Sequence, residues 1–149
     1  MTKILYVCVQ NSARSQIAEA WTRKLCGPEV EVMSAGLEPG TLNPLAVEAM
    51  REVGVDISMK TTQSVFDLFR SGKLFNYVIT VCDETSAERC PIFPGFATHL
   101  HWSFADPAAF EGAADEKLGK TRVVRDEIRA KVEELCAAIC PRVSVSQTN

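Results

Sequence analysis

The sequence predicts an α/β fold in which an open, mostly parallel four-stranded sheet is covered by helices on both faces, giving three layers. Apolar runs of strand length alternate along the chain with segments of helical periodicity, which is the pattern of βαβ units. The 149 residues fit one domain with a well-formed core. Apolar residues make up 46% and charged residues 23% of the chain, as in ordinary globular proteins.

The first half of the chain begins with a nearly continuous apolar run, which is typical of a strand buried on both faces. The next segment places Ile17, Trp21 and Leu25 on one face of a helix. Asn43 and Pro44 form an N-cap followed by a first-turn proline. The elements predicted here are strands at residues 3–9 and 30–34 and helices at residues 15–25 and 44–53.

The second half predicts two shorter strands and the longest helix, whose apolar positions include Val124, Ile128 and Val132. The predicted elements are a short helix at residues 65–69, strands at 77–81 and 98–102, and a helix at 121–139. Residues 1–141 are expected to form the single domain. Residues 142–149 are polar, lack helical periodicity and are expected to be a flexible tail.

Charge and cysteine content exclude several classes of protein. A net charge of −3 without a basic patch argues against nucleic-acid or membrane binding, and no apolar run reaches the ~18 residues of a membrane span. No signal-peptide pattern is present, so we expect a cytoplasmic monomer with reduced thiols. Cys26, Cys136 and Cys140 are then expected to serve packing or surface roles, without a metal.

The loop between the first strand and the first helix predicts an oxyanion site. Backbone N–H groups of a tight loop and of a helix start bind anions, and the guanidinium of Arg14 fits a tetrahedral oxyanion. The same positive surroundings favour a thiolate nucleophile at Cys8. The expected oxyanion-binding loop comprises Cys8, Val9, Gln10, Asn11, Ser12, Ala13, Arg14 and Ser15.

A second cysteine is expected close to this loop. Cys82 ends the third predicted strand, and parallel strands present their carboxyl ends at the same edge of a sheet. If the first and third strands are neighbours, Cys8 and Cys82 lie together. This placement favours a joint chemical role over two buried apolar thiols.

Several stretches resemble one known family. "CVQNSARSQIAEAW" fits the C-x5-R-S loop of the low-molecular-weight tyrosine phosphatase fold, with its flavodoxin-like winding. "SAGLEPGTLNPLAVEAMREVGVDIS", "VITVCDETSAERCPIFPG", "HWSFADPA" and "RVVRDEIRAKVEEL" extend the resemblance from Lys3 to about Ala138. The segments from Cys82 to Cys90-Pro91 and from His101 to Asp106-Pro107 resemble the thioredoxin-coupled arsenate reductases of this fold.

The resemblance implies a catalytic relay of cysteines. Cys8 would attack arsenate while Asp106 protonates the departing oxygen. Cys82 would then attack Cys8 and release arsenite, and Cys90 would resolve the disulfide for thioredoxin to reduce. The polar DETSAER segment between the last two cysteines can refold around the new disulfide. Phosphate and sulfate would compete with arsenate.

Two positions depart from the family pattern. The third loop position, often glycine in related loops, is Gln10. Some relatives bind potassium, and the matching positions here are Asn11, Glu19 and Ser34. A further carboxylate position corresponds to Gln63, which argues against potassium, so we expect no tightly bound cofactor.

Three other functions remain open from the sequence. A tyrosine phosphatase would use Cys8, Arg14 and Asp106 but would not need Cys82 or Cys90. A reductase coupled to glutathione or mycothiol would depend on Cys8 alone. A non-enzymatic arsenite sensor would bind its ligand through two or three cysteines.

Overall fold

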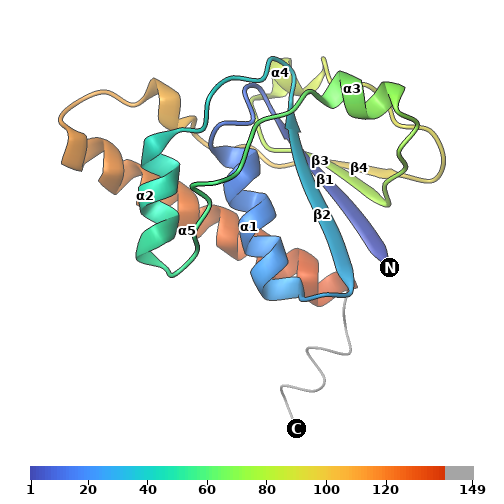
Figure 1. Ribbon diagram of the computed structural model, residues 1–149, viewed down its shortest axis with the longest axis horizontal. Helices are drawn as coiled ribbons and strands as arrows, with labels where there is room; N and C mark the ends of the chain where they lie inside the picture. The colour runs from blue at the N-terminus through green and yellow to red at the C-terminus, as the bar shows by residue number, and fades with distance from the viewer. Residues whose placement is uncertain (140–149) are drawn as a thin grey trace, which may run out of the picture.

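A computed structural model describes residues 1–139 of the chain and contains a four-stranded sheet with helices on both sides (Figure 1). The strands are β1 (Thr2–Cys8), β2 (Val30–Gly36), β3 (Tyr77–Thr80) and β4 (Thr98–His101). The α-helices are α1 (Arg14–Cys26), α2 (Pro44–Glu52), α3 (Val65–Arg70), α4 (Glu84–Ala87) and α5 (Ala114–Ile139), and η1 (Pro107–Ala109) is a 3₁₀ turn. The expected tail at residues 142–149 lies outside the described residues.

The sheet has the strand order β2-β1-β3-β4, and every neighbouring pair is parallel. The α/β prediction is therefore confirmed. β1 lies between β2 and β3, and in the β1–β3 ladder Val7 pairs with Thr80. The carboxyl ends of β1 and β3 consequently meet at one edge of the sheet, where a ligand site is expected.

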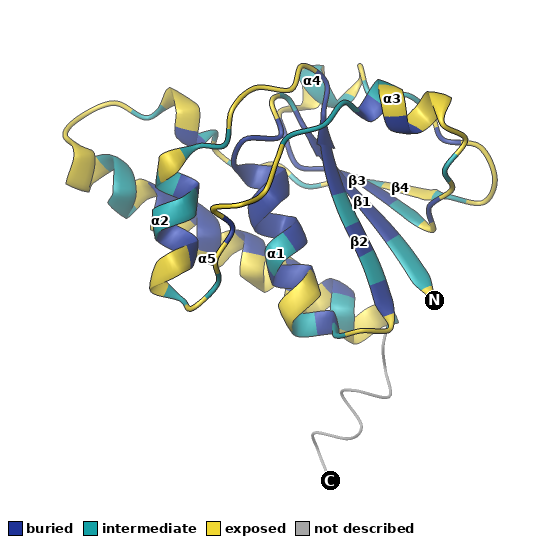
Figure 2. Cartoon of the chain, in the orientation of Figure 1, coloured by how far each residue is buried: buried dark blue, intermediate teal, exposed yellow. Residues whose placement is uncertain are grey.

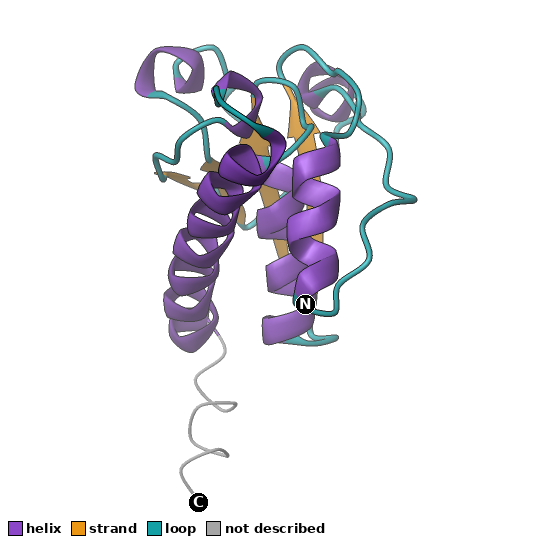
Figure 3. Cartoon of the chain, turned by 90° about the vertical axis from the view of Figure 1, so that its left-hand side faces the viewer, coloured by secondary structure: helices purple, strands orange, loops and turns teal. Residues whose placement is uncertain are grey.

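Alternate residues of the central strand enter two separate cores. Ile4, Tyr6 and Cys8 pack with α1, α2 and α5, whereas Leu5 and Val7 pack on the face covered by α3. Figure 2 shows β1 and α1 largely buried, while α5 carries a buried stripe and an exposed face. The side view in Figure 3 shows the helices that cover the face of Ile4, Tyr6 and Cys8 in front of the strands. Burial on both faces explains why β1 lacks an alternating polar pattern.

The structure differs from the sequence-based prediction at several element ends. α5 begins at Ala114, seven residues before the predicted start, because its first two turns are mostly exposed and therefore carry no apolar repeat. β2 continues to Gly36 through pairing with β1. The DETSAER segment contains the four-residue helix α4, which Asp83 caps through its contact with the Ser86 N–H at 2.7 Å.

Cys26 and Cys136 form a disulfide, so the expectation that both are unpaired packing thiols is wrong. The bond joins the last residue of α1 to the last turn of α5, and the Cα atoms of the two cysteines lie 5.4 Å apart. The pairing depends on how α1 packs against α5 and not on any local cysteine motif. Cys140, the third cysteine in that prediction, lies outside the described residues.

Within residues 1–139, no helix is both long enough and apolar enough to cross a membrane.

Candidate active site

The loop from Cys8 to Arg14 runs from the end of β1 into α1 and is held by backbone contacts. Leu37 and Glu38 donate their N–H groups to the Cys8 and Val9 carbonyls at 3.1 and 2.7 Å. A Cβ atom on Gly36 would lie only 2.8 Å from the Asn11 nitrogen, so the close approach of β2 to the loop requires glycine there. Gly36 lies beyond the strand predicted at residues 30–34, and sequence reasoning assigned it no role at the loop.

The start of α1 leaves its backbone donors available to an anion. The N-cap residue is Ala13, which makes no side-chain capping bond, and the first turn contains no acidic residue. Unpaired N–H groups and the positive end of the helix dipole therefore face the loop. Together with Arg14, these donors match the predicted oxyanion cradle.

The Cys8 sulfur is buried and surrounded by polar groups. The Asn11 N–H donates to Cys8 Sγ at 3.2 Å, and the Ser15 hydroxyl lies 2.9 Å from the same sulfur. Asn11 adopts a positive φ of 57°, a backbone conformation that asparagine tolerates better than most residues. These contacts fix the nucleophile at the mouth of the anion cradle.

Arg14 and Asp106 meet at this site from distant parts of the chain. Arg14 is 5% exposed, and its guanidinium lies 3.3 Å from both Asp106 Oδ2 and the Phe104 carbonyl. The other Asp106 oxygen accepts from the Ala108 N–H at 3.0 Å, which orients the carboxyl group at the start of η1. The Asp-Pro turn therefore brings a partly exposed carboxyl group to the oxyanion loop.

Cys82 lies beside the loop as a fully buried free thiol. It shares one core with Cys8, because β1 and β3 are adjacent and the Val81 N–H donates to the Val7 carbonyl at 2.8 Å. Burial raises the pKa of Cys82 to about 11; the nearby Arg14 cation lowers this pKa, whereas charge on Cys8 raises it. Cys82 is therefore a protonated thiol at neutral pH.

Cys90 is a half-buried free thiol at the end of the segment that carries α4. It packs against the second core, while Cys82 belongs to the first. Burial, with a smaller contribution from charge on Cys82, raises the pKa of Cys90 to about 11. The three predicted relay cysteines are all free, and electrostatic interactions link Cys82 to both of the others.

The raised pKa of Cys90 predicts slow alkylation at neutral pH. At pH 8 the thiolate fraction of a group with this pKa is on the order of a hundredfold below that of an ordinary thiol. Because a raised pKa delays ionisation, the rate of iodoacetamide labelling should still rise tenfold per pH unit between pH 8 and 10. Peptide mass spectrometry of pulse-labelled protein measures this rate, and a plateau near pH 9 would contradict the prediction.

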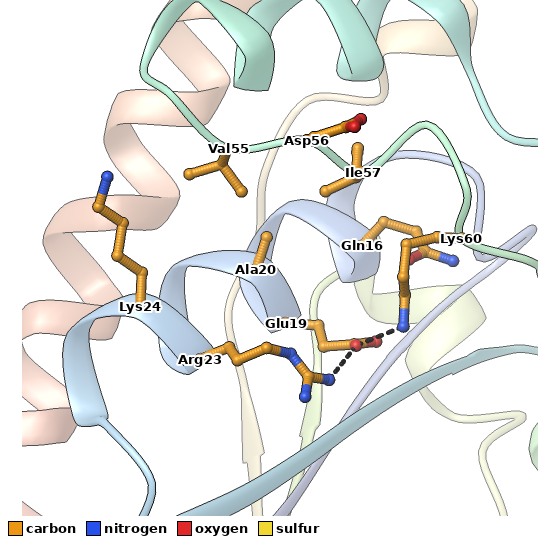
Figure 4. A pocket seen from close by; sticks show the side chains of 9 residues that line it. All are labelled: Gln16, Glu19, Ala20, Arg23, Lys24, Val55, Asp56, Ile57 and Lys60. Atoms are coloured by element: carbon orange, nitrogen blue, oxygen red, sulfur yellow. Dashed lines mark hydrogen bonds and ion pairs between the residues drawn. The ribbon is translucent and has the colours of Figure 1, made fainter.

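A buried polar network extends from the loop to a cavity behind it. We call Glu19, Ser34, Asn11 and Ser15 the Glu19 network. The Ser34 hydroxyl donates to Glu19 Oε1 at 2.7 Å, and the Asn11 side-chain amide donates to Ser34 at 3.0 Å and to Ser15 at 2.7 Å. Figure 4 shows the far end of this network, where Arg23 and Lys60 contact Glu19.

The Glu19 network does not fit a potassium ion. Glu19 Oε2 already accepts from Arg23 at 2.6 Å and from Lys60 at 2.5 Å. The Gln63 backbone N–H donates to Asn11 Oδ1 at 3.0 Å, and its side-chain amide donates to the Ser34 carbonyl at 2.9 Å. Glu19 Oε2, Asn11 Oδ1 and the Ser34 carbonyl are thus occupied by N–H donors, and Glu19 Oε1 by the Ser34 hydroxyl. In the described part of the chain, no group of three or more His, Cys, Asp or Glu side chains is arranged to hold a metal.

Lys60 is a second residue near the site that sequence reasoning did not connect to it. It lies 41 positions after Glu19 in the loop that follows α2. A lone lysine in a polar loop carries no sequence signal for a contact with a buried carboxylate. Only the packing of residues 55–60 against α1 reveals the pair.

Comparisons with known proteins agree with this geometry. Residues 3–145 match the family described as low molecular weight phosphotyrosine protein phosphatase. The arsenate reductase of Bacillus licheniformis is 44% identical over 131 residues, covering 87% of this chain and 91% of the relative. The Bacillus subtilis arsenate reductase is 42% identical and covers 89% and 94% of the two chains.

Solved structures of arsenate reductases are also similar to this chain. An arsenate reductase in the oxidized state superposes with a TM-score of 0.76 at 31% identity, covering 93% of this chain and 99% of that one. A thioredoxin-dependent arsenate reductase of Corynebacterium glutamicum superposes with a TM-score of 0.68 at 30% identity, covering 93% of this chain and 61% of that one. The chain belongs to the low molecular weight phosphotyrosine protein phosphatase family, in its arsenate reductase branch.

Proposed function

We propose that this protein reduces arsenate to arsenite in the cytoplasm by a relay of Cys8, Cys82 and Cys90, with thioredoxin as the electron donor. The observation that carries the proposal is the meeting of an anion cradle, a buried nucleophilic cysteine and a second free cysteine at the ends of adjacent strands. A phosphatase of this fold needs the first two features but has no use for Cys82. The 44% identity to a curated arsenate reductase supports the same conclusion.

The first step forms a bond between Cys8 sulfur and arsenic. Arsenate binds in the loop, and the Arg14 guanidinium together with the N–H groups of α1 neutralises its charge. The Cys8 thiolate attacks arsenic, and one oxygen leaves as water after it accepts a proton from Asp106. Arsenic stays in the +5 state as a thiol adduct.

The second step transfers two electrons to arsenic. The Cys82 sulfur attacks the Cys8 sulfur, the sulfur–arsenic bond breaks, and its electron pair leaves with arsenic as arsenite. Formation of the adduct removes the Cys8 charge that helps to raise the pKa of Cys82, while the pKa-lowering effect of Arg14 remains. Adduct formation thus prepares Cys82 to ionise and attack.

The third step moves the disulfide toward the surface. Cys90 attacks Cys82, which frees Cys8 and leaves a Cys82–Cys90 disulfide. α4 has no buried residues, so little packing opposes the rearrangement of the segment between these cysteines. Ile92 is 82% exposed two residues beyond Cys90 and offers an apolar contact for thioredoxin.

A single-turnover experiment tests the proposal. Fully reduced protein is mixed with one equivalent of arsenate without reductant, and arsenite, free thiols and disulfides are measured. One arsenite per chain, two thiols lost and a Cys82–Cys90 bridge are expected, with turnover after addition of thioredoxin. No arsenite and no thiol loss would contradict the relay; activity restored only by glutathione or mycothiol would indicate the small-thiol route, and strong phosphotyrosine hydrolysis a phosphatase.

The Asp106→Asn variant tests the proton donor. The amide keeps the shape of the side chain but cannot protonate the departing oxygen, so kcat should fall about 10²–10³-fold. Phosphate protection of Cys8 against alkylation measures oxyanion binding separately and should remain within a few-fold of wild type. An equal loss of kcat and of phosphate protection would mean that Asp106 only shapes the loop through Arg14.

A further inference from the structure

We propose that Lys60 is a positioning residue whose ammonium group takes the place of a dissociable monovalent cation behind the oxyanion loop. This inference builds on the proposed function, because the loop that Lys60 supports is the arsenate site. It goes beyond that function because it states that a side chain of the protein, and not a bound ion, supplies the positive charge opposite Glu19.

The buried carboxylate of Glu19 creates the need for a positive charge. Its side chain is 3% exposed, and a buried carboxylate without a partner is strongly unfavourable. The Ser34 hydroxyl satisfies one carboxylate oxygen, but a neutral donor does not balance the charge. Lys60, at 2.5 Å from the other oxygen, supplies that balance together with Arg23.

Lys60 differs from Arg23 in what it connects. Arg23 lies one turn after Glu19 on the same helix, so its ion pair is local to α1. Lys60 belongs to the loop after α2, and its neighbour Thr61 accepts from the Gln16 amide at 3.1 Å. The ion pair with Glu19 therefore ties a separate segment of the chain to the back of the oxyanion loop.

The effect reaches the nucleophile through continuous contacts. Glu19 orients Ser34, and both Ser34 and Ser15 accept from the Asn11 side chain. Asn11 and Ser15 are the residues that contact the Cys8 sulfur. A change in the charge at Glu19 therefore alters the support of the loop without contacting arsenate.

The surroundings of Lys60 allow a small cation to replace its ammonium group. Lys60 lines a cavity of about 220 Å³ between α1 and residues 55–57 (Figure 4). Gln16 also lines this cavity, and its buried side-chain Oε1 has no hydrogen-bond partner among the described residues. Removal of the lysine amine would leave Glu19 and this oxygen as acceptors for a cation entering from solvent.

The test uses Lys60→Met with Lys24→Met as the matched control. Lys24 lines the same cavity but contacts the Val53 carbonyl at 3.4 Å and not Glu19. In choline chloride, kcat/KM for arsenate should fall about tenfold in Lys60→Met and stay near wild type in Lys24→Met and Lys60→Arg. Replacing choline with potassium or methylammonium at equal ionic strength should restore most of the loss in Lys60→Met and leave wild type unchanged.

A second readout does not depend on arsenate turnover. Potassium should raise the thermal unfolding midpoint of Lys60→Met by several degrees relative to choline, because a ligand of the folded state stabilises it. The wild-type midpoint should be the same in both salts. Potassium stabilisation of wild type, or a Lys60→Met defect that no cation reverses, would overturn the inference. Failure of wild type to reduce arsenate would instead contradict the proposed function and leave the midpoint comparison valid.

Discussion

The Cys8→Ser variant is expected to release no measurable arsenite and to lose no thiols in a single turnover, a decrease of at least ~10³-fold. A serine hydroxyl is a much weaker nucleophile than a thiolate, and its oxygen cannot form a disulfide with Cys82. The substitution is nearly isosteric, and both Asn11 and Ser15 can contact the new hydroxyl, so the fold should remain intact. Circular dichroism and the unfolding midpoint check that the loss is chemical.

The Cys90→Ser variant gives the sharpest comparison with Cys8→Ser. It retains the nucleophile and Cys82, so one equivalent of arsenate should still yield one arsenite per chain. The protein should then stop as a Cys8–Cys82 disulfide, which peptide mapping identifies. If Cys90→Ser released no arsenite, Cys90 would act before arsenite leaves and the proposed order of attack would be wrong.

Removal of the Cys26–Cys136 disulfide should produce the largest change in stability. The bond joins residues 110 positions apart, and a cross-link closing a loop of this size stabilises a protein by up to about 4–5 kcal/mol through the unfolded state. In non-reducing buffer, the Cys26→Ala/Cys136→Ala variant should therefore unfold at a midpoint at least ~10 °C lower. Differential scanning calorimetry measures this shift.

Reduction of the wild-type protein provides the matched control for that experiment. A thiol reductant should lower the wild-type midpoint toward that of the double variant and should leave the variant unchanged. Single-turnover arsenate reduction should be similar in both proteins, because α1 separates Cys26 from Arg14 by ~18 Å. A wild-type midpoint that does not respond to reductant would show that the bond is absent in solution or does not stabilise the fold.

The sequence predicted the elements that have a strong local signal. β1 is apolar on both faces, and the Asn43-Pro44 start of α2 is confirmed by the Asn43 side chain, which accepts from the Leu45 N–H at 2.8 Å. The early turns of α5 were missed because they are mostly exposed and include Gly119. The disulfide was missed because its two cysteines meet only after α1 and α5 have packed together.

The residues of the candidate site likewise divide into those with a local sequence signal and those without one. Cys8 and Arg14 lie within one loop whose spacing carries the chemistry, so sequence alone could place them. Asp106 and the partnership of Cys82 with Cys90 came from the resemblance, and the ion pair between Arg14 and Asp106 agrees with that placement. Gly36 and Lys60 act through contacts with distant segments, which composition and periodicity do not encode.

The parallel ladder between β1 and β3 has a consequence for redesign of this fold. Each thiol is placed by counting residues from the backbone pair Val7–Thr80, one step to Cys8 and two steps to Cys82. Wholesale replacement of the apolar side chains in either core would preserve that count and with it the encounter of the two sulfurs. Insertion of one residue into β3 would instead turn the side chains that follow it, including that of Cys82, toward the opposite face of the sheet. The relay is therefore tolerant of changes in sequence and intolerant of changes in length.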